Sequence, residues 1–280
     1  MISLDELNLS TRDLPSLPAV VEEIINLSDD SEINIEVLTN KIQRDPGISA
    51  QVLSLANSPF YGLQSQVSSL KEACIILGVH TLKNLAIATG IIKHFSNTKN
   101  SAIDIMDIWK HSIATAVAAK VLAAELGLDE DMAFTAGLLH DIGKIILDKV
   151  KNEKYQEVML YKNKHDCFLI EAEKNVLGIT HADVGEYVAI KWKLPEEIAI
   201  IIRDHHMLGD KNFNKLSALV HVADIISCGL LLSGKDKKVM PNLNENALGL
   251  LSLDMDMLTR CLPVIDSMNS VTGSILLTKH

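Results

Sequence analysis

Apolar residues recur at the three- and four-residue spacing of an amphipathic helix along almost the whole chain. No stretch of useful length alternates between apolar and polar residues, as a half-buried strand would. We therefore predict an all-α fold, with helices over residues 20–27, 35–42, 46–55, 69–77, 81–95, 103–126, 133–149, 155–164, 168–177, 180–193, 195–206 and 215–232. Two weaker helices are predicted over residues 245–251 and 254–268.

Local chemistry marks several of the predicted helix ends. Asp45 has the side chain of an N-cap and is followed by Pro46, a residue favoured at the first helical position. Thr180 and Asp183 have the spacing of a capping box. Gly127 is expected to end the helix that begins near residue 103.

A polar segment over residues 96–101 contains no large apolar residue and is typical of a linker. We place the main boundary of the chain there. The prediction is an N-terminal helical lobe over residues 1–96, a second helical lobe over residues 105–232 and a C-terminal helical extension over residues 233–280. Residues 57–62 are rich in turn formers and are predicted to form a loop.

Composition and charge narrow the classes of partner. The chain has 280 residues, of which 48% are hydrophobic and only 4% aromatic, so Leu, Ile, Val and Ala must build its core. The formal net charge is −10. A negative surface repels phosphate backbones, and we expect no nucleic-acid partner.

The chain is expected to lie in the cytoplasm, away from membranes. Its N-terminus lacks the basic and then apolar pattern of a signal peptide. The most apolar stretch, residues 219–232, contains His221 and Asp224 and is too short to cross a bilayer. The cysteines include no CxxC pair and lie far apart, as expected of reduced thiols: Cys74, Cys167, Cys228 and Cys261.

The doublet His140-Asp141, inside the apolar run from Gly137 to Lys144, is the strongest chemical signal. Burying an imidazole beside a carboxylate is costly unless something pairs with both. A cation such as iron, zinc or manganese would do so, because these ions accept nitrogen and oxygen ligands. Further residues of the same types are His111, His181, His205, His206 and Asp224. Lys144, one turn after the doublet, is placed to neutralise a phosphate oxygen.

Each of these residues also has a simpler interpretation. A single histidine is more often a core or surface residue than a ligand. Asp141 and Lys144 have the spacing of a surface ion pair. His205-His206 could be an exposed helix end, favoured by the helix dipole. If residues 133–149 form one helix, His140 and Asp141 point about 100° apart, and both reach a single centre only if it lies between their directions.

The order of these residues resembles that of the HD superfamily of metal-dependent phosphohydrolases, most closely its HD-GYP branch. The matching positions are His111, His140-Asp141-Ile-Gly-Lys144, His181, His205-His206 and Asp224. Every position that matches the ligand order holds a competent ligand. Asp107 stands where some three-metal relatives have an additional carboxylate. The Gly-Tyr-Pro signature is absent, since His206 is followed by Met-Leu-Gly.

The first half of the chain, together with three segments further along it, is similar to the HDOD domain, a bacterial signalling module related to HD domains. The similar segments are Leu14-Pro-Ser-Leu-Pro18, Asp45-Pro-Gly-Ile-Ser49, Leu55-Ala-Asn-Ser58, Tyr61-Gly62, Leu77-Gly78, Trp109, the Gly137 run and Trp192-Lys-Leu-Pro195. The resemblance covers about residues 14–226 and implies a two-lobed helical fold with an HD-like bundle in its C-terminal part. It also implies a role in bacterial signal transduction, often beside receiver, sensor or cyclic-di-GMP domains. Because no such domain fits in 280 residues, we expect this module to stand alone.

Two functions follow from this resemblance. In the first, one or two divalent ions are held by His111, His140, Asp141, His181, His205, His206 and Asp224, with Asp141 bridging and Asp107 as an extra candidate. Asp141 and Lys144 are then the catalytic residues of a phosphohydrolase. In the second, the domain is a non-catalytic module that binds a signalling protein, and its metal site is structural or vestigial. A sensor of a nucleotide or another phosphorylated small molecule lies between the two, and the oligomeric state stays open.

Overall fold

The computed structural model describes residues 16–27, 33–57, 66–95, 100–206, 213–230 and 242–276. All regular secondary structure in these ranges is helical, and no strand occurs in them. The predicted all-α fold class is therefore confirmed. The predicted loop over residues 57–62 lies outside the described residues, apart from Asn57.

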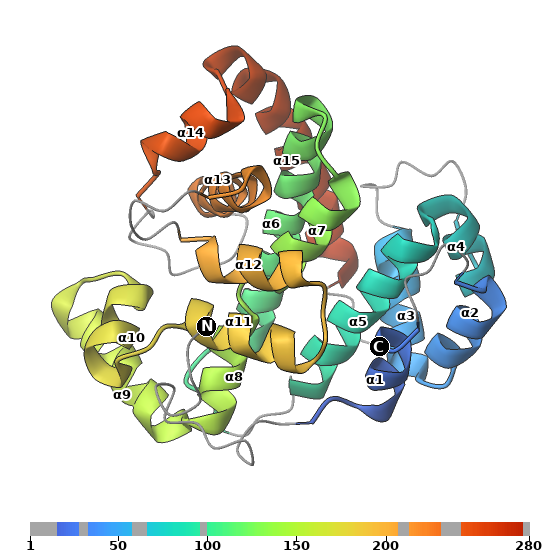
Figure 1. Cartoon of the computed structure of the whole chain (residues 1–280), viewed down its shortest axis with the longest axis horizontal. Helices are drawn as coiled ribbons and strands as arrows, with labels where there is room; N and C mark the ends of the chain where they lie inside the picture. The colour runs from blue at the N-terminus through green and yellow to red at the C-terminus, as the bar shows by residue number, and fades with distance from the viewer. Residues whose placement is uncertain are drawn as a thin grey trace.

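The N-terminal helices lie together on one side of the molecule (Figure 1). In chain order they are α1 (Ala19–Ile25), α2 (Ile35–Gln43), α3 (Pro46–Ala56), α4 (Leu70–Leu77) and α5 (Val79–Phe95). Helix α5 contacts each of the other four and so forms the centre of this group.

The second half of the described chain forms a larger helical bundle. Its helices are α6 (Ile105–Leu126), α7 (Glu130–Leu139), α8 (Ile142–Val150), α9 (Asn152–His165), α10 (Leu169–Leu177), α11 (His181–Lys191), α12 (Glu196–Asp204) and α13 (Lys215–Gly229). Helices α7 and α13 pack along α6, while α11 packs between α8 and α12. Helices α9 and α10 pair with each other at the edge opposite the N-terminal helices (Figure 1).

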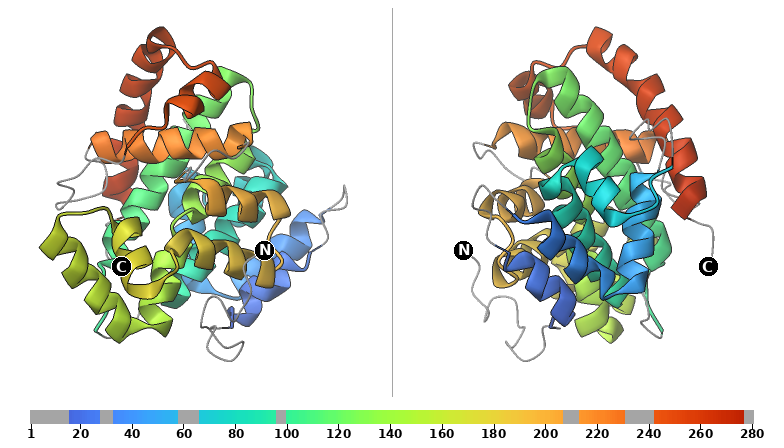
Figure 2. Two further views of the ribbon diagram at one scale, coloured as in Figure 1. Left: turned by 60° about the vertical axis from the view of Figure 1, so that its left-hand side comes forward. Right: turned by 90° about the vertical axis from the view of Figure 1, so that its right-hand side faces the viewer.

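The two C-terminal helices pack on the outside of this bundle, against α13 and α6. Helix α14 (Glu245–Leu251) packs on α13, and α15 (Met255–Leu276) runs along one edge of the molecule (Figure 2). Helix α15 contacts both α6 and α3. It is longer than the predicted helix over residues 254–268. The extension thus touches both predicted lobes.

One cluster of buried apolar side chains runs from Leu17 to Ile202 and crosses the linker that we predicted as the main boundary. Phe95 at the end of α5 stacks on Trp192 after α11, with ring centroids 6.2 Å apart. A second cluster lies between α6, α13, α14 and α15. The predicted lobes therefore share a core, and the domain boundaries themselves stay a prediction.

The single helix predicted over residues 133–149 is wrong. The chain forms α7 and α8 instead, and His140 and Asp141 lie in the turn between them. Asp141 has φ −97° and ψ 8°, which is outside the helical range. Because the helix is interrupted at the doublet, the two side chains are released from the 100° separation that a continuous helix imposes.

Several predicted helix ends are confirmed. Asp45 caps α3 through Oδ1, and Thr180 with Asp183 forms a capping box on α11. Gly127 ends α6 in the left-handed conformation, with φ 64°. Helix α11 ends at Lys191, two residues before the predicted end, because Lys193 adopts φ 57°, a value that a helix does not accept.

The cap of α3 gives a first prediction. Asp45 Oδ1 accepts hydrogen bonds from the backbone N–H groups of Gly47 and Ile48 and lies 2.5 Å from Lys93 Nζ on α5. Partial burial alone would raise the pKa of Asp45, but Lys93 and the two N–H groups hold that pKa below its ordinary value. We expect Asp45→Ala to lower the free energy of unfolding at neutral pH by about 1–2 kcal/mol.

The sign of the pH dependence follows from the lowered pKa. The charge of Asp45 stabilises the fold above its unfolded pKa of about 4, and that contribution is lost as the pH falls through the lower folded value. Asp45→Asn keeps a good N-cap and removes only the charge. Urea unfolding should show that Asp45→Asn is less stable than the wild type at pH 7 and that the difference in the free energy of unfolding is smaller at pH 3. An equal difference at both values would contradict the account.

Candidate metal centre

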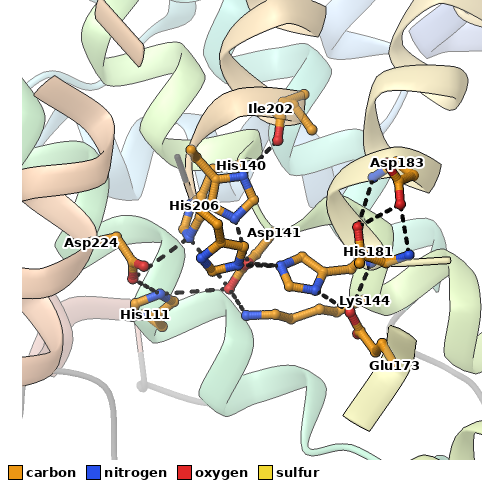
Figure 3. Close-up of polar contacts among 12 residues, drawn as sticks. His111, His140, Asp141, Lys144, Glu173, His181, Asp183, Ile202, His206 and Asp224 are labelled. Atoms are coloured by element: carbon orange, nitrogen blue, oxygen red, sulfur yellow. Dashed lines mark hydrogen bonds and ion pairs between the residues drawn. The ribbon is translucent and has the colours of Figure 1, made fainter. Parts of the chain in front are cut away.

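The structure brings the seven predicted ligand residues together in the second half of the chain (Figure 3). They come from separate elements. His111 lies on α6, the doublet in the turn between α7 and α8, and Asp224 on α13. His181 is the first residue of α11, while His205 and His206 directly follow α12. Helix ends therefore supply most of the set, and irregular backbone there lets neighbouring side chains converge.

Asp141 lies at the centre of the group. Its Oδ2 lies 2.6 Å from Lys144 Nζ, 3.4 Å from His140 Nε2 and 3.5 Å from His111 Nε2. Its Oδ1 lies 3.5 Å from His181 Nε2 and 3.8 Å from His205 Nε2. The two carboxylate oxygens thus face two different sets of imidazoles, which is the arrangement that a bridging carboxylate requires.

The ligand atoms on either side of Asp141 form two compact groups. On the Oδ2 side, His111 Nε2 lies 2.8 Å from Asp224 Oδ1, which is 4.0 Å from His140 Nε2. On the Oδ1 side, the Nε2 atoms of His206 and His181 lie 2.8 Å apart, with His205 beside them. Two nitrogens bound at 90° to one ion at 2.0–2.1 Å would lie about 2.9 Å apart, so this spacing suits a shared ion.

Hydrogen bonds at Nδ1 fix the orientation of three of these rings. His140 Nδ1 lies 2.7 Å from the Gly137 carbonyl oxygen, and His205 Nδ1 lies 2.6 Å from that of Ile202. Because a carbonyl oxygen only accepts, each Nδ1 carries a proton, and in the neutral ring each Nε2 then keeps a lone pair. His181 Nδ1 lies 2.6 Å from Glu173 Oε2 and also carries a proton, because the carboxylate oxygen accepts the hydrogen bond. Metal-binding histidines are oriented in this way.

Three buried atoms in the centre lack a hydrogen-bond partner among the residues that the structure describes: His140 Nε2, His205 Nε2 and Asp141 Oδ1. An unsatisfied buried polar atom costs about 1–3 kcal/mol, so three at one place need a common explanation. Divalent cations on the two sides of Asp141 would provide it, since all three are ligand atoms that such ions accept. The nitrogen and oxygen donors fit iron, zinc or manganese.

The electrostatics of the centre keep both carboxylates and two of the histidines in the protonation states that a metal requires. Burial alone would lower the pKa of His140, but Asp141 and Asp224 hold that pKa above its ordinary value, and a bound cation would displace the extra proton. Burial alone would raise the pKa of Asp141 and Asp224, but neighbouring histidines, and Lys144 beside Asp141, hold both carboxyls well below their ordinary range. Burial and the neighbouring histidines place the pKa of His205 and His206 well below the ordinary value. At neutral pH these carboxylates are ionised and these two imidazoles are neutral.

Glu173 on α10 was not predicted as part of the site. Its Oε2 accepts hydrogen bonds from both the backbone N–H and Nδ1 of His181, and its Oε1 accepts one from the Tyr155 hydroxyl at 2.8 Å. Glu173 is fully buried. The sequence contains a signal, because Glu173 falls on the apolar stripe of α10 beside Ala172.

We expect Glu173→Gln to weaken metal binding about 10- to 100-fold, as other losses of an orienting partner do. A glutamine holds His181 less strongly, because the hydrogen bond from Nδ1 loses its charged acceptor. Glu171→Gln, on the exposed face of the same helix, is the matched control. Competition with a metal chelator measures both variants. If Glu173→Gln binds metal as tightly as Glu171→Gln does, Glu173 stabilises the hydrophobic core and does not support metal binding.

Asp107 and His221 interact with groups other than the candidate ligand atoms. Asp107, the extra candidate, pairs with Lys110 at 3.6 Å and is 41% exposed. It belongs to none of the ligand groups found among the described residues. His221 donates from Nδ1 to the His205 carbonyl oxygen and accepts at Nε2 from the backbone N–H of Asn244. His221 thus connects the backbone of a candidate ligand to the residue that caps α14.

Two side chains of the centre are partly exposed. The side chain of Lys144 is 16% exposed and His206 is half-buried. The other candidate ligands are buried, with 6% or less of the side chain exposed. A small anion would therefore approach along Lys144 and His206.

Comparison with known proteins places this geometry in a family. The sequence pattern of the HDOD domain matches residues 14–208. A crystal structure of an HDOD domain protein of unknown function from Geobacter sulfurreducens superposes with a TM-score of 0.79, at 25% identity and with 94% of each chain covered. A candidate phosphohydrolase from Shewanella amazonensis has the same fold, with a TM-score of 0.77, 24% identity, and 97% and 98% of the two chains covered.

Curated relatives match over shorter stretches. Ribonuclease Y of Lactobacillus acidophilus is 31% identical over 159 residues, which are 56% of this chain and 23% of that protein. The chain spans less than two fifths of the length of the first curated relatives that it matches. Within the described residues, no helix is both long and apolar enough to cross a membrane.

Proposed function

The chain belongs to the HDOD domain family, and on this premise we propose that it binds divalent metal ions and hydrolyses a phosphate ester. The observation that carries the proposal is the set of three buried, unpartnered ligand atoms around Asp141, found among the described residues. A domain that had lost its metal would be expected to replace such atoms by apolar or paired groups, because leaving them unsatisfied is costly.

The residues on the two sides of Asp141 would hold two ions. His111, His140 and Asp224 would bind on the Oδ2 side, and the three remaining histidines on the Oδ1 side: His181, His205 and His206. Bound divalent ions polarise a phosphate and lower the pKa of a water molecule.

Charge balance supports an anionic substrate. Asp141, Asp224 and Glu173 carry the acidic groups of the buried cluster, and Lys144 is its cation. One divalent ion balances the excess of carboxylates over lysine, and a second makes the centre positive. A buried positive centre is stable only with an anion, and a phosphate ester meets that need.

Lys144 is the residue that would meet the substrate. Burial alone would lower its pKa, but the carboxylates of Asp141 and Asp224 hold that pKa above its ordinary value, so the side chain stays a cation. Its Nζ lies 2.6 Å from Asp141 Oδ2, and its side chain is partly exposed. From there it can bind a non-bridging phosphate oxygen and stabilise the charge that develops on it.

Lys144→Met tests this role. The variant keeps the length of the side chain and loses its charge, and we expect turnover to fall about 100-fold or more while bound metal is retained. Lys149→Met, on the exposed face of the same helix, should keep full activity. Hydrolysis of bis-p-nitrophenyl phosphate and p-nitrophenyl phosphate by the metal-loaded protein is the assay. Unchanged turnover in Lys144→Met would contradict the assignment.

The alternative is a regulatory module that binds metal without turnover. The absence of Gly-Tyr-Pro after His206 and the HDOD helices before α6 favour it. Its partner would be a signalling protein in the cytoplasm, or a nucleotide held at the metal centre. A protein that is fully loaded with metal and hydrolyses neither ester would favour this alternative over the enzyme.

A further inference from the structure

Cys228 lies one helical turn after Asp224 on α13, and its side chain contacts that candidate ligand. Its Sγ is 3.6 Å from Asp224 Oδ1. The same oxygen lies 2.8 Å from His111 Nε2 and 4.0 Å from His140 Nε2, so it is the oxygen that faces the other ligands. Cys228 is 6% exposed. One nitrogen, one oxygen and one sulfur, from His111, Asp224 and Cys228, all lie within 4.8 Å of one another.

The spacing of the sulfur and the oxygen suits two ligands of one ion. Zinc binds sulfur at about 2.3 Å and oxygen at about 2.0–2.2 Å, so tetrahedral angles place the two ligand atoms about 3.6 Å apart. The distance from Cys228 Sγ to Asp224 Oδ1 is 3.6 Å. A weak thiol hydrogen bond to a carboxylate gives a similar distance, so the spacing alone does not decide between them.

The neighbouring atoms favour Cys228 as a metal ligand over a thiol that only donates a hydrogen bond. His140 Nε2, which lies beside the same oxygen of Asp224, is buried and has no hydrogen-bond partner among the described residues. An ion that satisfies His140 and is held by His111 and Asp224 would lie within reach of the Cys228 sulfur. The cluster thus offers a sulfur donor on the Oδ2 side of Asp141, while the donors that the structure groups on the other side are imidazoles.

We propose that Cys228 is a thiolate ligand of the ion held by His111 and Asp224, and that it makes the two metal positions chemically different. This inference rests on the proposed metal centre and extends it to the kind of metal. A thiolate favours zinc, iron or cobalt over manganese and magnesium, which prefer oxygen ligands. The thiol proton passes to the solvent when the sulfur binds the ion. The other position, rich in imidazole, keeps broader selectivity.

Cobalt substitution tests the proposal directly. A thiolate bound to Co²⁺ produces a charge-transfer absorption band in the near ultraviolet, which imidazole and carboxylate ligands do not give. We expect this band in the cobalt-loaded wild type and its loss in Cys228→Ser. Cys261→Ser is the matched control, because Cys261 is equally buried but packs between α15 and α6, among apolar side chains. It should keep the band.

Metal selectivity provides a second measurement. Cys228→Ser should bind zinc at least about tenfold more weakly at one position, while its affinity for manganese changes little. X-ray absorption of the zinc-loaded wild type needs no variant and should contain one sulfur neighbour at about 2.3 Å. It decides the question even if Cys228→Ser fails to fold.

The outcomes separate this inference from the proposed function. A protein that binds metal but has neither the cobalt band nor a sulfur neighbour overturns the assignment of Cys228 and leaves the metal centre intact. A band that survives in Cys228→Ser and disappears in Cys261→Ser also overturns it. A protein that binds no metal overturns both.

Discussion

Asp141→Asn is expected to reduce the metal content of the purified protein to about a tenth or less of the wild-type value, because both ions lose their shared negative ligand. The carboxylate of Asp141 faces His111 and His140 through Oδ2, and His181 and His205 through Oδ1. An asparagine has the same shape but one neutral oxygen. It also leaves Lys144 without its closest carboxylate partner. Elemental analysis of protein prepared without chelators measures the effect.

Asp131→Asn is the control for this variant. It makes the same chemical change on α7, where Asp131 is 45% exposed and pairs with Lys120 at 3.5 Å. Asp107→Asn should also retain metal, because Asp107 belongs to none of the ligand groups among the described residues. Loss of metal in Asp107→Asn would indicate that Asp107 is a metal ligand after all. Full metal content in Asp141→Asn would contradict the bridging role that we assign to Asp141.

Gly143→Ala is expected to destabilise the fold by about 3 kcal/mol or more, because an added methyl group would overpack the contact between α8 and α11. A Cβ at Gly143 would overlap the backbone carbonyl of His181, and it would lie 2.9 Å from the backbone nitrogen of Gly185. Backbone atoms cannot turn aside as a flexible side chain does. Relief requires a shift of α11, which carries His181, so metal binding should weaken as well.

Gly249→Ala is the matched control. Nothing lies within 4 Å of a Cβ at Gly249 in α14, and alanine has the higher helix propensity, so this variant should gain about 0.5–1 kcal/mol. Thermal unfolding compares the two. For a chain of this size the loss in Gly143→Ala corresponds to a decrease in Tm of about 6–12 °C. Equal Tm values for Gly143→Ala and the wild type would mean that the two helices are not in close contact.

Most of the helices could be predicted because they depend on local sequence. The apolar period of 35–42 gave α2, and the side chains of Asp45 and Thr180 marked the first residues of α3 and α11. These signals act over one or two helical turns, so they do not depend on where the helix packs in the fold. Helix ends that depend on backbone conformation, such as the left-handed Lys193, were predicted less well.

The interruption at His140-Asp141 could not be predicted from periodicity. Apolar residues continue through Leu138, Leu139, Ile142 and Ile145 as they would in one helix. Contacts between distant segments accompany the break, since Asp141 faces histidines from α6, α11 and the end of α12. A window of local sequence contains none of these partners.

The candidate ligands came from their order and type and from the family resemblance, and the structure brings them together. Residues that support them were missed for different reasons. Glu173 could have been found, because a glutamate on an apolar stripe needs a buried partner. Cys228 has the one-turn spacing from Asp224, but a cysteine in an apolar helix is ordinarily a core residue.

Anomalous X-ray scattering from crystals of the untreated protein tests the metal centre most directly. We expect a peak at an iron, zinc or manganese absorption edge, about 2.0–2.2 Å from Asp141 Oδ1 and His205 Nε2. A second peak is expected on the Oδ2 side of Asp141, beside His111 and Asp224. Crystals that hold no anomalous scatterer between these residues, even after soaking with each of the three metals, would contradict the account.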